Sequence, residues 1–353
     1  MNMDRNEVLR RVQLAEPVLE ADLSGMDFTG EDLSATVFDG CRFDDARLAG
    51  ADLCESVFIR CSFARTSMER SRMTGASFAE CTVQRAVMAD VDMKSVAFFQ
   101  CTVEGLAMNA SRLASVSFVK SKLDGLLFRQ GRLSQVTMVD CETGVLDFAK
   151  ASLDSCVLMG CDLKRAAFSG TEFSTVVFLK SDLSGHSFAG QRFATCQFME
   201  ADLRGCDFSR AQLAKGNFQK ARLAGASFEG AEAANAIFMD ADLAGARFDR
   251  ANLVQAIFIG ARAADSSFAS ANLHQSNWTG AALPGARLDG CELTYADFSH
   301  ADLRRADLRG ASMFRSNLHE AKDEGALYTD RARALESDPV LLASERWQPA
   351  PLS

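Results

Sequence analysis

Long apolar runs are absent from this sequence, and so are many of the residues most often used in catalysis and recognition. Its 353 residues include only four histidines, two tyrosines and two tryptophans. No segment has the roughly 20 consecutive apolar residues of a membrane-spanning helix. Residues 1–17 are charged throughout and lack the apolar core of a secretion signal. We therefore expect a cytoplasmic protein without a membrane partner, whose 11 cysteines are free thiols in a reducing compartment.

Motifs that bind cofactors or carry catalysis are missing as well. The sequence has no glycine-rich phosphate loop, no Gly-x-Ser-x-Gly nucleophile elbow and no HExxH motif. His186, His274, His300 and His319 share no metal-ligand spacing. We predict no catalytic residue, no cofactor and no metal site, and hence a protein that is not an enzyme.

The net charge of −9 is unevenly spread along the chain. Residues 1–60 contain 13 acidic and 6 basic residues, whereas residues 101–200 contain 10 of each. Binding to nucleic acid would require an extended basic surface, and binding to single strands would also require exposed aromatic residues between the basic ones. Neither pattern is present, so we expect no nucleic-acid partner.

What the sequence has in abundance is a five-residue repeat from Ala21 to about Glu320. A large apolar residue recurs at every fifth position except at Thr143, Ala233 and Ala263, and a small residue usually stands two positions before it. A helix cannot use this pattern, because five steps of about 100° rotate each large residue away from the previous one. In an extended chain, residues two apart point the same way. The repeat therefore predicts very short extended sides with two inward residues each, joined by corners. Residues 201–220 illustrate it with Leu203, Phe208, Leu213 and Phe218, preceded by Ala201, Cys206, Ala211 and Gly216.

A second period of twenty residues gives the number of sides. Cysteine recurs at this interval, and so do two columns of phenylalanine that lie ten residues out of phase. Twenty residues must then stack on the next twenty, which predicts four sides per coil and about 15 coils. The cysteine column consists of Cys41, Cys61, Cys81, Cys101, Cys141 and Cys161.

The segments ADLSG, ADLRG, ANLVQ and ADFSH resemble the repeats of the pentapeptide-repeat family. The resemblance implies an all-β fold, a right-handed quadrilateral β-helix. The middle coils depart from the family pattern, because Leu106, Leu126 and Leu146 stand where small residues are usual. Val103 and Thr143 stand where large residues are usual, so we interpret the departures as volume compensation within the core.

The domain organisation follows from where the repeat begins and ends. We predict a capping helix in residues 1–20, with Asp4 and Glu7 in capping-box spacing, and a β-helix in residues 21–320. Residues 321–353 form a C-terminal tail with a short helix that begins at Asp338. We expect the apolar residues of this helix to pack onto the last coils.

One outward column of the predicted β-helix is apolar, although outward positions elsewhere are polar. It contains the residue after the large residue on one face, taken in steps of twenty, and a monomer seldom exposes so much contiguous apolar surface. We call this column the apolar stripe. Its predicted partner-binding residues are Ile59, Phe99, Val119, Val139, Met159, Leu179, Met199, Met239 and Ile259.

Three interpretations of the apolar stripe stay open. It binds a partner protein or a second copy of the chain, the C-terminal tail covers it, or the assignment of inside and outside is wrong there. The first interpretation gives our leading hypothesis, a non-enzymatic protein–protein interaction scaffold.

The family resemblance adds two more specific functions. Some members look like accessory or adaptor proteins of bacterial type VI secretion. Others, related to quinolone resistance, imitate duplex DNA and occupy the DNA-binding saddle of DNA gyrase and other type II topoisomerases. This alternative requires an extended acidic surface, whereas the acidic segment here is confined to Glu16–Asp52.

Overall fold

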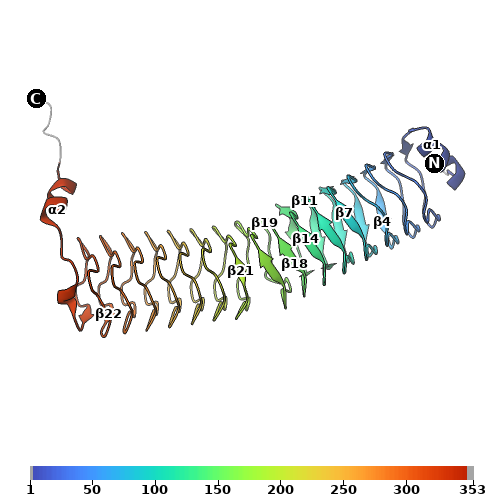
Figure 1. Ribbon diagram of the computed structural model, residues 1–353. Helices are drawn as coiled ribbons and strands as arrows, with labels where there is room; N and C mark the ends of the chain where they lie inside the picture. The colour runs from blue at the N-terminus through green and yellow to red at the C-terminus, as the bar shows by residue number, and fades with distance from the viewer. Residues whose placement is uncertain (1–2, 348–353) are drawn as a thin grey trace, which may run out of the picture. The chain divides into compact units, whose positions relative to one another are not determined.

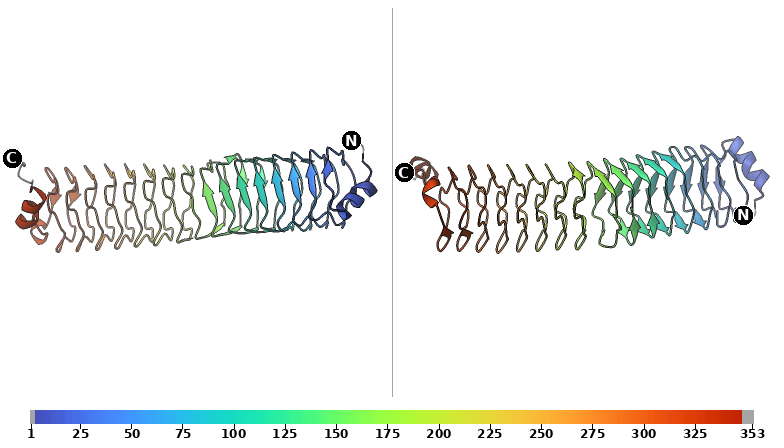
Figure 2. Two further views of the ribbon diagram at one scale, coloured as in Figure 1. Left: turned by 90° about the horizontal axis from the view of Figure 1, so that it is seen from above. Right: turned by 60° about the horizontal axis from the view of Figure 1, so that its bottom comes forward.

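The computed structural model describes residues 3–347, which divide into two compact units, residues 3–183 and residues 184–347. Within each unit, successive coils stack on one another in parallel (Figures 1 and 2). The chain forms a parallel β-solenoid of about 16 turns, against the 15 expected from the sequence. The predicted all-β class is confirmed.

A ladder of backbone hydrogen bonds joins each coil to the residues twenty positions later. In the first unit, Phe58 pairs with Phe38 on one side and with Phe78 on the other. In the second unit, Arg222 bridges to Asp202. The constant offset confirms four five-residue sides in each turn.

Nearly every side ends at a corner residue that has a left-handed backbone conformation; Val145 and Arg165 are the exceptions among the corners from Ala15 to Gly325. Arg250 and Tyr295, for example, have φ angles of 59° and 60°. This conformation costs a residue other than glycine ~1–2 kcal/mol. The ladder opposes that cost, because Arg250 N–H donates to the Ala269 carbonyl at 2.9 Å and Tyr295 N–H donates to the Phe314 carbonyl at 3.1 Å. The corners are therefore part of the hydrogen-bonded ladder.

In the first unit, the ladders are regular enough to form strands. The largest sheet has eight parallel strands, in the order β1 (Val18–Leu19), β2 (Val37–Asp39), β3 (Val57–Ile59), β5 (Ser77–Ala79), β8 (Ala97–Phe99), β11 (Ser117–Val119), β15 (Thr137–Val139) and β19 (Val157–Met159). Another side carries β4 (Ser62–Ala64), β6 (Thr82–Gln84), β9 (Thr102–Glu104), β12 (Lys122–Asp124) and β16 (Glu142–Thr143). The remaining sides carry β7 (Asp92–Lys94), β10 (Arg112–Ala114), β14 (Arg132–Ser134), β18 (Ser152–Asp154) and β20 (Glu172–Ser174), and the pair β13 (Leu126–Leu127) and β17 (Leu146–Asp147).

In the second unit, the ladder consists mostly of single bridges. Its short elements are β21 (Phe193–Ala194), β22 (Asp307–Leu308), β23 (Leu327–Tyr328) and the 3-10 helix η1 (Arg331–Arg333). The ladder continues past Glu320, where the five-residue pattern ends. Strand β22 pairs with β23, and Asn317 bridges to Leu335. This extension accounts for the additional turn.

The interior of each unit is filled by two inward side chains from every side. Phenylalanines of one column stack face to face, as Phe218 and Phe238 do with ring centroids 4.9 Å apart and planes 4° apart. The second column meets the first edge to face, because the Phe228 and Phe238 rings are 5.7 Å apart at 88°. The period of twenty therefore places like residues against like residues in a solid core.

The middle coils show how the core accommodates leucine at small-residue positions. Leu106, Leu126 and Leu146 are fully buried, as is Val103. Thr143 is only half-buried, so it does not fill the inward position that the repeat assigns to it. In this coil, the large side chain of Leu146 thus fills core space at a small-residue position, while Thr143 leaves the core position where a large residue is usual.

Helix α1 (Arg5–Gln13) contacts β1 at the beginning of the first unit (Figure 1). Asp4 is its N-cap, and the carboxylate accepts the Glu7 backbone N–H at 2.9 Å. Val8 is fully buried, so this helix contributes apolar surface to the core. The predicted capping helix is present, although it is shorter than the segment assigned to it.

Helix α2 (Pro339–Glu345) starts where the sequence predicted, with the Asp338 carboxylate accepting the Val340 and Leu341 backbone N–H groups. The expectation that its apolar side chains pack onto the last coils is wrong. None of its side chains is buried, and Val340 is 79% exposed. Leu341 is also exposed and Leu342 is half-buried, and polar contacts join Glu345 and Arg346 to the last coils.

Candidate functional site

The outer surface of the eight-stranded sheet carries six residues of the apolar column in exact strand register. In each three-residue strand the middle side chain points into the core, as fully buried Phe98 does, and the flanking side chains point outward. The register brings the third residues of six neighbouring strands into one row, ~24 Å long at ~4.8 Å per strand. The row consists of Ile59, Ala79, Phe99, Val119, Val139 and Met159.

None of the side chains in this row is buried in the core. Phe99 is the most exposed at 44%, and its register neighbours are the smaller Ala79 and Val119. Val57 and Val157 lie outward on the same face and are half-buried. The sequence therefore assigned the inside and the outside of this face correctly.

The other faces of the same coils carry charged residues at the equivalent outward positions. Glu104 and Lys122 are exposed on the sheet that contains β9 and β12. Arg112 and Arg132 are exposed on the sheet that contains β10 and β14. Arg129, exposed on the remaining side, forms an ion pair with Asp147. The apolar face is thus one of four.

Charges of both signs border the apolar row at the adjacent corner. The corner residues in successive coils are Arg60, Glu80, Gln100, Lys120 and Asp140, and all five are exposed. An apolar centre with a polar, mixed-charge rim is the usual arrangement of a protein–protein interface.

The apolar stripe continues in both units. In the first unit, Val177 bridges to Val157, and half-buried Leu179 follows it. In the second unit, the predicted residues Met199, Met239 and Ile259 are also half-buried. Gln219 interrupts this second portion, and its amide lies 3.8 Å from the Met239 sulfur. Each portion belongs to its own unit, and the six-strand row is the best-ordered part of the stripe.

The C-terminal segment makes its polar contacts with the last coils of the second unit. Within residues 3–347, the side chains of Glu345 and Arg346 bind His300, His319 and Glu320. His319 stands in the column of the apolar stripe, three steps of twenty after Ile259, so these contacts reach the end of that column and none of the predicted stripe residues. The structure therefore does not support the interpretation that the tail covers the stripe.

A family model of pentapeptide repeats matches the chain in eight copies that together cover more than half of it. The matched segments are residues 20–53, 41–79, 147–178, 156–190, 192–230, 236–275, 266–305 and 291–322. The chain belongs to the pentapeptide-repeat family.

Several solved structures of pentapeptide-repeat proteins are similar to the chain. QnrB1, a plasmid-mediated fluoroquinolone resistance protein, is 17% identical over 65% of this chain and 98% of its own, with a TM-score of 0.25. HetL from the cyanobacterium Nostoc is 19% identical over 93% and 94%, with a TM-score of 0.17. A protein from the thylakoid lumen of Arabidopsis thaliana is 29% identical over 34% and 70%, with a TM-score of 0.20. No curated protein sequence matches the chain.

Neither of the α-helices in the described residues 3–347 is long and apolar enough to cross a membrane.

Residues 80–146 lie outside the segments matched by the pentapeptide-repeat model. Three strands of the apolar face, β8, β11 and β15, fall within this stretch. Half of the six-residue row, Phe99, Val119 and Val139, thus lies in coils that the family model does not match.

The cysteines of this pentapeptide-repeat protein belong to the core. Ten of the eleven are buried, and Cys54 is half-buried. The Cys61 thiol donates to the Phe38 carbonyl at 3.4 Å, so it also satisfies a backbone acceptor. Burial raises the pKa of Cys156 to about 11 and that of Cys291 to about 12. Thiols in this state are poor nucleophiles near neutral pH.

We expect the thiol reagent DTNB to modify no more than one cysteine, Cys54, in the folded protein at pH 8, and all eleven after denaturation. The release of thionitrobenzoate, followed by absorbance, measures both numbers. A Cys54→Ser variant provides the control and should show no rapid phase. Rapid modification of several thiols in the native protein would contradict the buried cysteine column.

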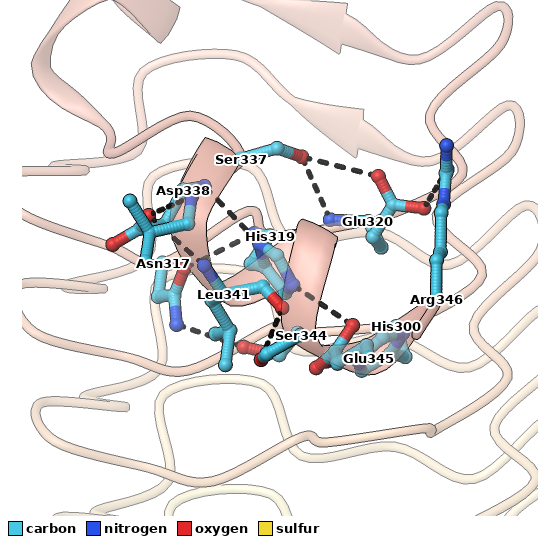
Figure 3. Close-up of polar contacts among 12 residues, drawn as sticks. His300, Asn317, His319, Glu320, Ser337, Asp338, Leu341, Ser344, Glu345 and Arg346 are labelled. Atoms are coloured by element: carbon cyan, nitrogen blue, oxygen red, sulfur yellow. Dashed lines mark hydrogen bonds and ion pairs between the residues drawn. The ribbon is translucent and has the colours of Figure 1, made fainter. Parts of the chain in front are cut away.

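Sequence reasoning missed one cluster of polar residues. His300 and His319 are 19 residues apart, which is close to one coil, and the solenoid places them on neighbouring coils with ring centroids 5.4 Å apart. Glu345 of α2 reaches both of them (Figure 3). The near-match of 19 to the period of twenty could have signalled the pair, but Glu345 lies beyond the repeat and no pattern in the sequence places it.

Proposed function

We propose that this pentapeptide-repeat protein is a non-enzymatic scaffold that binds a partner protein on the outer face of the eight-stranded sheet. The observation that carries the proposal is the row of six in-register apolar residues on one of four faces. Exposed apolar patches of this kind on soluble proteins mark binding surfaces.

The chemistry of the rim supports a protein partner. Arg60 and Lys120 alternate with Glu80 and Asp140 along the corner beside the row, so the face has no field of one sign. A nucleic acid or an anionic membrane surface would require an excess of positive charge there. A protein surface with a complementary apolar centre satisfies both the row and its rim.

The rigidity of the face also suits a scaffold. Residues Phe99 and Val119 extend from strands whose backbone groups are paired on both sides with neighbouring coils. The middle residues of these strands are anchored in the core by stacked rings, as Phe98 and Phe118 are with centroids 4.8 Å apart. The face is therefore preorganised, which reduces the entropy lost on binding.

The experiment that tests this function places charge in the centre of the row. A Phe99→Asp, Val139→Asp double variant should fold normally, because both side chains point outward, but should lose its partner. The matched control is Ala114→Asp, on the outward side of β10, where Lys94 in the register-paired strand can offset the new charge. Circular dichroism checks the fold, and capture from an extract of the native cells, quantified by mass spectrometry, measures binding.

Size-exclusion chromatography with light scattering separates a partner protein from a second copy of the chain. If the double variant becomes monomeric where the parent is a dimer, the occupant of the face is a second copy. If the parent, the double variant and the control are all monomers and all capture the same proteins, the proposed docking face is wrong. The role in type VI secretion rests on the family resemblance alone, and no feature of the face favours it.

The alternative function, mimicry of DNA toward a topoisomerase, draws on the acidic segment Glu16–Asp52. In the first unit, however, an arginine from the next coil pairs with many of these carboxylates. The pairs are Arg42–Asp22, Arg47–Asp27, Arg60–Asp39, Arg65–Asp45 and Arg72–Asp52. An imitation of the phosphate backbone requires unpaired negative charge, so these pairs weaken the alternative.

We therefore expect supercoiling by DNA gyrase to continue at its normal rate when the protein is present at a stoichiometric amount. Agarose-gel analysis of plasmid topoisomers measures this rate, and a reaction that receives the buffer without the protein is the control. Inhibition of gyrase by a stoichiometric amount of the protein would favour DNA mimicry over the protein-binding scaffold.

A further inference from the structure

We propose that His300, His319 and Glu345 bind a divalent transition-metal ion of the Zn²⁺ class, which fastens α2 to the last coils of the second unit. This site is independent of the apolar face. Two imidazoles and one carboxylate are a common donor set for such ions.

The spacing of the three donor groups suits one ion. The Nε2 atom of His319 lies 3.2 Å from Oε2 of Glu345, and Nε2 of His300 lies 3.3 Å from Oε1 (Figure 3). Each of the three residues offers one donor atom, and these three atoms lie within 4.8 Å of one another. Tetrahedral coordination with bonds of ~2.0–2.1 Å places donors ~3.4 Å apart. The two nitrogen–oxygen distances, which involve different oxygens of Glu345, match this spacing, and separations of up to 4.8 Å between donors would have to shorten on binding.

Three separate segments position these donors. The left-handed corner at His300, with φ of 59°, turns its side chain toward the next coil, and its backbone N–H donates to the His319 carbonyl at 2.8 Å. The His319 backbone N–H donates to the Asn317 side-chain oxygen at 3.0 Å, which fixes the start of that side chain. Glu345 comes from the last residue of α2.

The environment is partly buried and partly open. The His319 side chain is 1% exposed, whereas the side chains of His300 and Glu345 are 45% and 34% exposed. A buried imidazole loses little freedom when it coordinates a metal. The exposed side leaves space for water to complete the coordination.

An ion would also explain what holds α2 in place. The helix has seven residues, too few to be stable alone in water, and it buries no side chain. Two sets of side-chain hydrogen bonds, which we call the clasp, attach it to the last coils: Glu345 contacts the two histidines, and Arg346 donates to Glu320 at 3.0 Å. The contacts of Glu345 with the two histidines, at 3.2 and 3.3 Å, lie at the long end of the range for N–H···O hydrogen bonds.

Binding has a definite proton cost at His319. The Asp338 backbone N–H donates to its Nδ1 atom at 3.2 Å, so without an ion the ring proton is on Nε2. A neutral histidine that coordinates through Nε2 carries its proton on Nδ1. Metal binding must therefore move this proton to Nδ1 and displace the Asp338 contact, which lowers the affinity of the site.

The test is isothermal titration of the full chain, free of any affinity tag, with ZnCl₂ at pH 7.5. We expect one ion per chain, with affinity reduced at least about tenfold in His300→Ala and in Glu345→Gln. Both residues are partly exposed, so these variants should fold. His274→Ala, a histidine outside the cluster, is the matched control and should bind as the parent does.

A second readout follows α2 itself. Zn²⁺ should slow tryptic cleavage after Arg346 in the parent and in His274→Ala, but not in Glu345→Gln. The proposal is overturned if no stoichiometric binding is found, or if His300→Ala and Glu345→Gln bind Zn²⁺ as tightly as the parent. In either case the cluster is a hydrogen-bonded clasp only.

Discussion

Replacing Phe238 with alanine is expected to lower the free energy of unfolding of the second unit by ~3–5 kcal/mol. The ring is fully buried and stacks between Phe218 and Phe258, with centroids 4.9 Å away on both sides. Phe228 and Phe248 contact it edge to face at 5.7 and 5.5 Å. Alanine would leave a cavity in the middle of a column that rigid coils cannot close.

Trp278 offers a local reporter for this loss. It is fully buried in the same column, and its ring stacks on Phe258 at 3.9 Å. Urea unfolding followed by tryptophan fluorescence would measure the change in a Trp347→Phe background, because Trp347 is 72% exposed and would otherwise contribute. Phe314→Ala is the matched control: Phe314 is 48% exposed, so its removal should change stability by less than ~0.5 kcal/mol.

A loss below ~1 kcal/mol for Phe238→Ala would contradict the conclusion that the phenylalanine columns stabilise the second unit. Stability in a solenoid is approximately a sum of nearest-neighbour terms. Because each ring contacts the coils before and after it, one substitution should affect several of these terms.

Gly144→Ala is expected to destabilise the first unit by ~1–3 kcal/mol. A Cβ atom on Gly144 would lie 1.9 Å from Oδ1 of Asp124, which itself accepts the Val145 backbone N–H at 2.7 Å. The carboxylate would have to move, and the Val145 N–H would lose its partner. Thermal unfolding followed by far-ultraviolet circular dichroism measures the effect.

A double-mutant cycle with Asp124→Ala identifies the cause. The aspartate substitution alone removes the hydrogen bond to Val145, and the clash with the new methyl group disappears in the double variant. Gly144→Ala should therefore cost clearly less in the Asp124→Ala background than in the parent. Equal costs in both backgrounds would show that the carboxylate is not what excludes a side chain at this position.

The regular part of the fold could be predicted because its periods are simple. A step of two within each five residues predicts inward pairs, and a step of twenty predicts four sides. Phe58, for instance, could be placed beside Phe38 and Phe78 from numbering alone. The outward position of Phe99 and Val139 followed from the same count.

Departures from the period could not be predicted in the same way. Thr143 stands at an inward position of the repeat, yet the coil withdraws it because Leu146 already occupies the core nearby. Between β16 and β17, the Val145 backbone N–H then donates to the side chain of Asp124 in the previous coil. Such departures depend on how the side chains of neighbouring coils fill the core together, and the repeat pattern of the sequence does not give that information.

The C-terminal segment was predicted as a helix but not in its packing. Asp338 and Pro339 indicate where α2 begins, because capping is a local property. Its docking through Glu345 onto two histidines is non-local, and the exposure of Val340 and Leu341 contradicts the simple rule that apolar residues of a cap turn inward. Polar contacts of this kind could be recognised only once the coils had been placed.

The most direct test of the docking face is photo-crosslinking in the native cells, with p-benzoylphenylalanine in place of Phe99. The matched control carries the same group in place of Phe314, which has nearly the same exposure, 48% against 44%. A binding face at the eight-stranded sheet predicts one adduct of defined mass from position 99 and none of that mass from position 314. No adduct from position 99, or the same adduct from both positions, would contradict it.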